Sequence, residues 1–355
     1  MILQDKIPSI YHSIFPELLS IEFPEEEIAT CNTCNLCRSI KSPYINTKCC
    51  TYHPHFANFL IGGVLTDDIE NLALGRAIIT GQIKARAGVT PYGIIPSVPY
   101  SIRQKEAEIQ EFWSRPHELT ESQLCPYYDN GNCTVWKYRE NLCITFFCSS
   151  IGGNAGQTFW NKLNKYLKMA ETILAQYAML ELGWAAATIK TEAVTTADFK
   201  LEDENGNIDE TKYATLWGEW AGREEDFYKK CFTIIKKMNA GTFKRITGIS
   251  REILEAAIRD TQNPFEKNTL PDYLIFNHSV VTENTKENYS RLILDKVCAE
   301  IPTVILPFIR GFNGKRKTSD IFHLGYNVLF NMTELVDELR EKNMLINIKI
   351  LLKNK

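Results

Sequence analysis

The sequence predicts a mainly α protein with two parts. An irregular, cysteine-rich, metal-binding region over 1–155 is expected to pack on an α-helical bundle over 156–355. Three observations indicate this fold class: nine of the 11 cysteines precede residue 149, turn-forming residues crowd the first part, and apolar residues recur at helical spacing in the second. A chain of 355 residues is long enough for roughly two domains, each with a core of its own.

The first part shows little sustained periodicity. The stretch "TPYGIIPSVPY" over 90–100 carries three prolines and a glycine, and "DNGNC" over 129–133 contains an Asn-Gly turn signal. These features predict loops that need something besides regular secondary structure to hold them in place. The boundary between the two parts is expected near 150–158, in the glycine-rich stretch "SIGGNAGQ".

The second part carries clear helix signals. Apolar residues from Phe159 onward repeat on one helical face, which predicts a long amphipathic helix over 159–184. Polar side chains fall largely on its other face: Lys162, Lys165, Lys168, Glu171 and Gln176. Further helices are expected over 216–238, 250–260, 289–301 and 319–345. Two cysteines in these helices, Cys231 and Cys298, are expected to be buried as small apolar residues.

Composition and charge restrict the class of protein. A net charge of −3 gives no reason to expect a nucleic acid partner. No stretch approaches the roughly 20 apolar residues that span a bilayer, so no membrane association is expected. The first twenty residues lack a basic n-region, which argues against a signal peptide and favours a cytoplasmic location. In a reducing compartment, clustered thiols indicate metal binding or redox chemistry rather than disulfides.

The clustered cysteines form two groups separated by 74 residues. Thiolates are soft ligands suited to zinc and iron–sulfur clusters, and a C-x2-C turn lets two sulfur atoms point toward one centre. All nine thiols are therefore predicted metal ligands. The first group is Cys31, Cys34, Cys37, Cys49 and Cys50, and the second is Cys125, Cys133, Cys143 and Cys148.

The spacing favours an iron–sulfur cluster, with zinc as the alternative. Structural zinc often uses two short C-x2-C pairs, and only the first group begins in that way. The adjacent Cys49 and Cys50 fit poorly on one tetrahedral zinc, because neighbouring side chains tend to diverge. Aromatic residues around the second group would shield a cluster from water. They are Tyr127, Tyr128, Trp136, Tyr138, Phe146 and Phe147. His53 and His55 follow the double cysteine and are interpreted as loop histidines in preference to ligands.

The stretch "CPYYDNGNCTVWKYRENLCITFFC" over 125–148 resembles the second half of the YkgJ-type cysteine-cluster family, a CxxCxxCC domain thought to chelate zinc or iron. The matching positions are Cys125, Pro126, Tyr127, Gly131, Cys133, Val135, Trp136, Arg139, Cys143, Phe147 and Cys148. The likeness covers this stretch and the first group, well under a third of the chain. It implies metal chelation. A more distant likeness to the iron–sulfur-containing flagellin lysine methylases implies modification of protein side chains.

Two departures from the family pattern stand out. Arg139-Glu140 replaces its Arg-Pro, and the compact CxxCxxCC is opened, which leaves nine thiols where the pattern has eight. Cys37 is predicted to be the extra thiol. Three hypotheses follow: an iron–sulfur protein acting in electron transfer or on a protein or peptide side chain, a zinc-stabilised interaction module without catalysis, and a thiol–disulfide switch. Whether the chain is an enzyme stays open at this stage.

Overall fold

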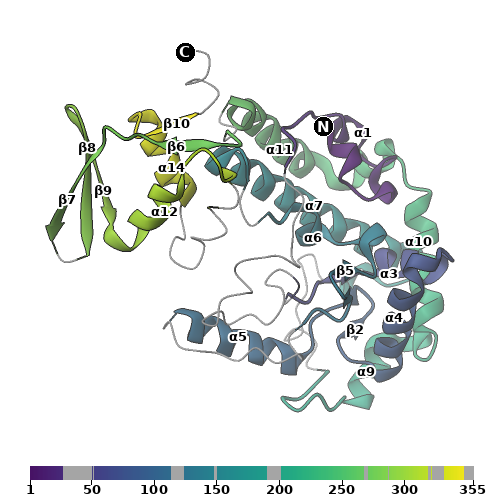
Figure 1. Cartoon of the computed structure of the whole chain (residues 1–355). Coiled ribbons are helices and arrows are strands. Elements are labelled where there is room, and N and C mark those ends of the chain that lie inside the picture. The colour runs from purple at the N-terminus through teal and green to yellow at the C-terminus, as the bar shows by residue number, and fades with distance from the viewer. Residues whose placement is uncertain are drawn as a thin grey trace. The chain divides into compact units, whose positions relative to one another are not determined.

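The computed structural model describes residues 1–26, 50, 52–112, 124–147, 150–189, 201–267, 271–286, 288–318, 321 and 332–347. Helices predominate among these residues, which confirms the mainly α class (Figure 1). The chain divides into two compact units. The first unit comprises 1–22, 40–146 and 161–258, and the second comprises 23–39, 147–160 and 259–355. Each unit is therefore assembled from segments that lie far apart in the sequence.

The first unit is built mainly from helices. Its longer helices are α3 (Asn58–Thr66), α4 (Ala73–Ala85), α5 (Val98–Phe112), α9 (Glu210–Trp217), α10 (Glu224–Lys236) and parts of α7 (Gly153–Glu181) and α11 (Ala240–Lys267). Shorter helices are η1 (Leu3–Asp5), η2 (Ser9–Tyr11), α1 (Pro16–Leu19), η5 (Glu70–Leu72), η7 (Trp136–Tyr138), α6 (Asn141–Thr145), η8 (Ala186–Thr188) and η9 (Gly218–Trp220). Short strands β1 (Phe56–Ala57), β3 (Gly93–Ile94) and β2 (Val89–Thr90) pair antiparallel in that order. Strands β4 (Tyr128–Asp129) and β5 (Asn132–Cys133) form a separate hairpin.

The prediction that the N-terminal part has little regular structure is wrong. Helices α3, α4 and α5 all lie within it, and α3 packs against α10 (Figure 1). The spacing of apolar residues did not indicate α3, because every residue from Asn58 to Val64 is buried. A helix that is apolar on all sides shows no amphipathic pattern.

The long helix predicted from residue 159 is confirmed as α7, which begins earlier, at Gly153. Most of the predicted apolar stripe is buried: Phe159, Leu163, Tyr166, Leu167, Ala170 and Leu174, whereas Ile173 and Tyr177 are half-buried. One residue assigned to the polar face does not lie there, because Glu171 is only 4% exposed. The predicted helix over 250–260 is also confirmed, inside α11.

The single helix expected over 216–238 is interrupted. Helix α9 ends at Trp217, and Gly218 follows with a φ of 54°. This left-handed conformation suits glycine and stops the helix. Helix α10 then starts at Glu224 with three acidic residues in its first turn, as the helix dipole prefers. Cys231 is buried in α10, as expected.

The second unit contains a sheet where a helix was predicted. Residues 289–301 form most of strands β8 (Tyr289–Leu294) and β9 (Val297–Pro302), and β8 also pairs with β7 (Val281–Lys286). Alternate residues of β8 and β9 are buried, including Leu292 and Ile301. This period of two is the pattern of a half-buried strand. Cys298 is exposed on β9, so the prediction that it is buried in a helix is wrong.

The remaining elements of the second unit cover this sheet. They are β6 (Leu274–Phe276), η10 (Thr303–Ile305), α12 (Leu306–Gly311), α14 (Met332–Glu341) and β10 (Leu345–Asn347), with β10 antiparallel to β6. Leu292 and Ile301 share one core with Ile309 of α12 and Leu339 of α14. The helix predicted over 319–345 ends earlier than expected, at Glu341 of α14, and its predicted part over 322–331 lies outside the described residues. In the parts of the chain described above, no helix combines the length and apolar character needed to cross a membrane.

Candidate functional site

Four of the nine predicted ligands lie among the described residues, all in the first unit. They are Cys50, Cys125, Cys133 and Cys143. The amide of Cys125 donates a hydrogen bond to the carbonyl oxygen of Cys50, at 2.5 Å. Cys133 lies on the β4–β5 hairpin directly after Cys125, and Cys143 lies on α6. Cys31, Cys34, Cys37, Cys49 and Cys148 fall outside the described residues.

The four thiols act on one another electrostatically. Burial raises the pKa of Cys125 to about 12, and the charges of Cys133 and Cys50 add to this shift. Burial also raises the pKa of Cys143, followed by the effects of Glu140, Cys125 and Cys133. Each thiol is therefore within electrostatic range of at least one other, and a bound cation would favour their thiolate forms.

The donor chemistry of this group fits a soft metal, because thiolates are the preferred ligands of zinc and iron–sulfur clusters. Among the described residues, however, no three cysteine, histidine or acidic side chains are arranged to hold a metal ion. The part of the chain that is described thus supplies soft donors on neighbouring segments and not a ligand set. The other five predicted ligands lie outside it.

His53 holds the chain beside two of these thiols. Its Nε2 atom donates a hydrogen bond to the carbonyl oxygen of Leu124, at 2.7 Å, and its ring stacks on Tyr100 with centroids 3.6 Å apart. Burial lowers the pKa of His53 to about 4, so the ring is neutral at physiological pH. Because Leu124 precedes Cys125, this bond and the Cys125–Cys50 bond join the same two segments. The structure thus gives His53 a structural role.

The predicted aromatic shell is only partly buried. Tyr127 and Tyr138 are buried, and the Tyr127 hydroxyl donates to Gln82 at 2.8 Å. Trp136 and Phe146 are 60% and 46% exposed. The guanidinium of Arg139 lies over the Trp136 ring, 3.9 Å from its centroid. The aromatic residues around the second cysteine group are therefore partly buried and partly exposed.

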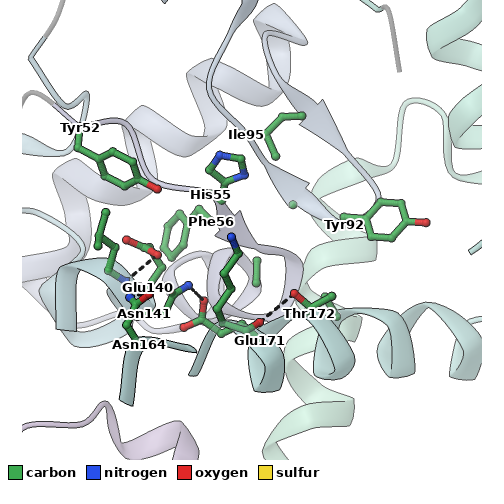
Figure 2. A pocket seen from close by; sticks show the side chains of 15 residues that line it. Tyr52, His55, Phe56, Tyr92, Ile95, Glu140, Asn141, Asn164, Glu171 and Thr172 are labelled. Atoms are coloured by element: carbon green, nitrogen blue, oxygen red, sulfur yellow. Dashed lines mark hydrogen bonds between the residues drawn. The ribbon is translucent and has the colours of Figure 1, made fainter. Parts of the chain in front are cut away.

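A cavity of about 320 Å³ lies beside Cys143 in the first unit. Its walls come from the chain after Cys50, the β3 hairpin, the start of α6, and α7. They are Tyr52, His55, Phe56, Ala57, Tyr92, Gly93, Ile95, Glu140, Asn141, Leu142, Asn164, Lys168, Glu171, Thr172 and Ala175. Figure 2 shows Tyr52, His55 and Ile95 on one side, facing Glu140, Asn141 and Glu171 on the other.

Glu140 connects this cavity to the thiols. Its carboxylate caps α6 by accepting hydrogen bonds from the amides of Leu142 and Cys143, each at 3.0 Å. It also forms a hydrogen bond with the Cys143 thiol, which favours its charged form. The YkgJ-type pattern has proline at this position. In this chain Glu140 stands there, and its side chain supplies the helix cap.

Glu171 lies next to Glu140 and is also buried. Its carboxylate accepts hydrogen bonds from the Tyr11 hydroxyl at 2.9 Å and from Asn141 Nδ2 at 2.6 Å. Burial raises the pKa of both acids, and the charge of Glu140 raises that of Glu171 further. Two buried carboxylates that oppose each other's ionisation are typical of functional sites.

Sequence reasoning missed this acid pair. One signal for Glu171 was present: it lies four residues after Leu167 and three before Leu174, on the edge of the apolar stripe of α7. A charged residue at such a position is buried with a partner or not at all. No local signal indicated that Glu140 would face Glu171. The contact is made through Asn141, the neighbour of Glu140, which donates a hydrogen bond to Glu171, 30 residues further along the chain.

In the second unit, Glu26 fixes the chain close to further predicted ligands. Its buried carboxylate accepts hydrogen bonds from Ser150 Oγ, from the amide of Ile151 at 2.9 Å, and from Trp160 Nε1 at 2.6 Å. Glu26 precedes Cys31 by five residues, and Ser150 follows Cys148 by two. The same carboxylate thus joins the chain that enters the first cysteine group to the chain that leaves the second.

The resemblance of 125–148 to the YkgJ-type pattern depends on its cysteine spacing and neighbouring residues. Comparison with known proteins adds no support to it, since the chain matches no family model, no curated protein and no solved structure.

Proposed function

We propose that this protein binds an iron–sulfur cluster through its clustered cysteines and acts in electron transfer or in modification of a protein or peptide side chain. One observation carries the proposal: the amide of Cys125 donates a hydrogen bond to the carbonyl oxygen of Cys50, so the two cysteine groups meet although 74 residues separate these two residues. A bound cation would favour the thiolate forms of these thiols. Their chemistry suits a soft metal.

The cavity supports a role beyond metal storage. Glu140 lines the cavity and also forms hydrogen bonds with the amide and the thiol of Cys143. A ligand in the cavity would thus lie next to a residue that contacts a predicted metal ligand. Concave sites with a few polar groups on an apolar wall are the usual form of substrate sites. This arrangement supports chemistry on a bound molecule, which a purely structural metal does not require.

A zinc-stabilised interaction module is the second candidate. The converging thiols suit zinc as well as iron, and zinc could hold loops such as the β4–β5 hairpin in place. The third hypothesis, a thiol–disulfide switch, has less support. Reactive thiols have lowered pKa values, whereas burial raises those of Cys125, Cys133 and Cys143.

Metal analysis with a visible spectrum tests the proposal. Protein isolated without oxygen is expected to contain iron and inorganic sulfide and to be brown, with broad absorbance near ~400 nm from thiolate-to-iron charge transfer. A colourless protein with stoichiometric zinc would reject the iron–sulfur proposal and favour the interaction module. Loss of free thiols under mild oxidant, without release of metal, would favour the switch.

A further inference from the structure

The cavity beside Cys143 presents charges of both signs to a ligand. On one side lie Glu140 and Glu171, which are 2% and 4% exposed. Their hydrogen bonds come from amide, hydroxyl and thiol groups, and neither carboxylate forms an ion pair with any lysine, arginine or histidine in the described residues. The acids are therefore held in position but not neutralised by a cation in contact with them.

Lys168 lies on the same cavity, one helical turn before Glu171 on α7. Its side chain is exposed, and its ammonium group forms no hydrogen bond or ion pair within the described part of the chain. The cavity thus has a cation at its open side and two carboxylates at its buried side.

The rest of the wall is largely apolar. Phe56, Ile95 and Leu142 contribute a ring and aliphatic groups, the Tyr92 ring points away from the cavity, and the Tyr52 hydroxyl points into the space between the two sides (Figure 2). A volume of about 320 Å³ suits a small molecule and is too small for a folded partner.

We propose that this cavity binds a free α-amino acid with an apolar side chain. Its ammonium group would contact the carboxylates of Glu140 and Glu171, its carboxylate would contact Lys168, and its side chain would pack on the apolar wall. The binding site goes beyond the proposed function and does not depend on which metal the thiols hold.

The two simpler ligands fit less well. An amine without a carboxylate would meet the acids but would also be repelled by Lys168. A carboxylate without an amine would meet Lys168 but would lie near two buried acids. Only a ligand with both groups satisfies both sides of the cavity.

Matched ligands test this inference by calorimetry on the full-length, metal-loaded protein. L-leucine, isopentylamine and 4-methylpentanoate share one side chain and differ in their charged groups. L-leucine is expected to bind at least about tenfold more tightly than either fragment, since a charge-assisted hydrogen bond contributes more than 1.4 kcal/mol. L-valine and L-phenylalanine extend the panel to other side chains. Absence of binding by all three amino acids would overturn the inference, as would isopentylamine binding as tightly as L-leucine.

Variants of α7 separate a zwitterion site from a cation site. Lys168→Met is expected to weaken L-leucine binding at least about tenfold and to strengthen isopentylamine binding, because the repulsive charge is gone. Glu171→Gln, which keeps the shape of the side chain, should weaken both ligands. Lys165→Met is the matched control, since Lys165 is exposed on the same helix and does not line the cavity. Unchanged L-leucine affinity in Lys168→Met would contradict the inference.

Iron and zinc content measured on the same preparations keep the two proposals apart. A zinc protein that binds L-leucine would reject the iron–sulfur proposal and support the amino-acid site. An iron–sulfur protein that binds none of the amino acids would reject the amino-acid site alone.

Discussion

The amide nitrogen of Cys125 donates a hydrogen bond to the carbonyl oxygen of Cys50, 2.5 Å away. These residues end and begin the two cysteine groups, so the bond places one end of each group side by side. The bond between His53 and Leu124 lies on the same two segments and supports this arrangement. These two hydrogen bonds thus hold the end of the first cysteine group beside the start of the second.

Loss of a converging thiol should lower metal content. Cys125→Ser and Cys133→Ser are each expected to reduce bound iron, together with the absorbance near ~400 nm, because serine is a poor ligand for a soft metal. Cys298→Ser is the control, since Cys298 is exposed on β9 of the second unit. Equal metal content in the three variants would contradict the assignment of Cys125 and Cys133 as ligands.

Cys37 tests the resemblance to the eight-thiol family pattern. If Cys37 is the extra thiol, Cys37→Ala should retain the metal content of the natural chain, whereas Cys34→Ala should lower it. Inductively coupled plasma analysis of both variants measures this. Loss of metal in Cys37→Ala would instead make Cys37 a ligand and leave another thiol as the extra one.

His53 should make the stability of the fold depend on pH. Burial lowers its pKa from 6.5 to about 4, so the unfolded chain binds more protons than the folded chain between these values. The stabilisation is complete above pH 6.5 and is lost as the pH falls toward 4, by at most about 3 kcal/mol.

Denaturant unfolding at several pH values checks the role of His53. In His53→Gln, the fall in the free energy of unfolding between pH 6.5 and 4 should be smaller than in the natural chain. His278→Gln changes an exposed histidine and serves as the control. An identical pH dependence in the natural chain and His53→Gln would show that His53 does not contribute.

Glu26 should stabilise the second unit. Glu26→Ala leaves Ser150 Oγ, the Ile151 amide and Trp160 Nε1 without their acceptor, and is expected to lower the free energy of unfolding by about 3 kcal/mol. Glu25 is exposed, so Glu25→Ala should change the free energy of unfolding by less than ~0.5 kcal/mol. Similar unfolding curves for the two variants would argue against the carboxylate network.

The contact of α3 with α10 requires a glycine. A Cβ atom at Gly62 would overlap the carbonyl oxygen of Tyr228, so Gly62→Ala should destabilise the fold by about 2 kcal/mol or more. Gly81 on α4 has open space around it, and Gly81→Ala should stabilise the fold by about 0.5–1 kcal/mol. Thermal unfolding followed by circular dichroism measures the stability of both variants. Gly62→Ala is expected to lower the unfolding temperature and Gly81→Ala to raise it.

Local patterns predicted α7 well and failed for two other elements. In α7, one face is buried and the other is solvated, so residues such as Leu163, Leu167 and Leu174 reveal the helix. In α3, both faces are buried, and the period disappears. In β8 and β9, the alternation of buried and exposed residues covers only a few positions in each strand. The turn between them at Asp295, with a φ of 53°, has no glycine or proline that would mark it in the sequence.

The thiol groups were visible in the sequence, whereas the cavity was not. Cysteine type and spacing report soft donors directly, because ligand chemistry belongs to the side chain itself. Glu140, Lys168 and Glu171 become a site only when α6 and α7 pack together. Neither residue type nor spacing indicates that packing, since these partners interact across long stretches of chain.

From its residues alone, this chain is a mainly α protein with nine clustered thiols. The packing of its helices decides that Glu171 is buried against Tyr11, 160 residues away. The physical reason is one of range. Side-chain periodicity and ligand type act over a few residues, whereas burial and the pairing of charges depend on contacts that form only in the folded chain.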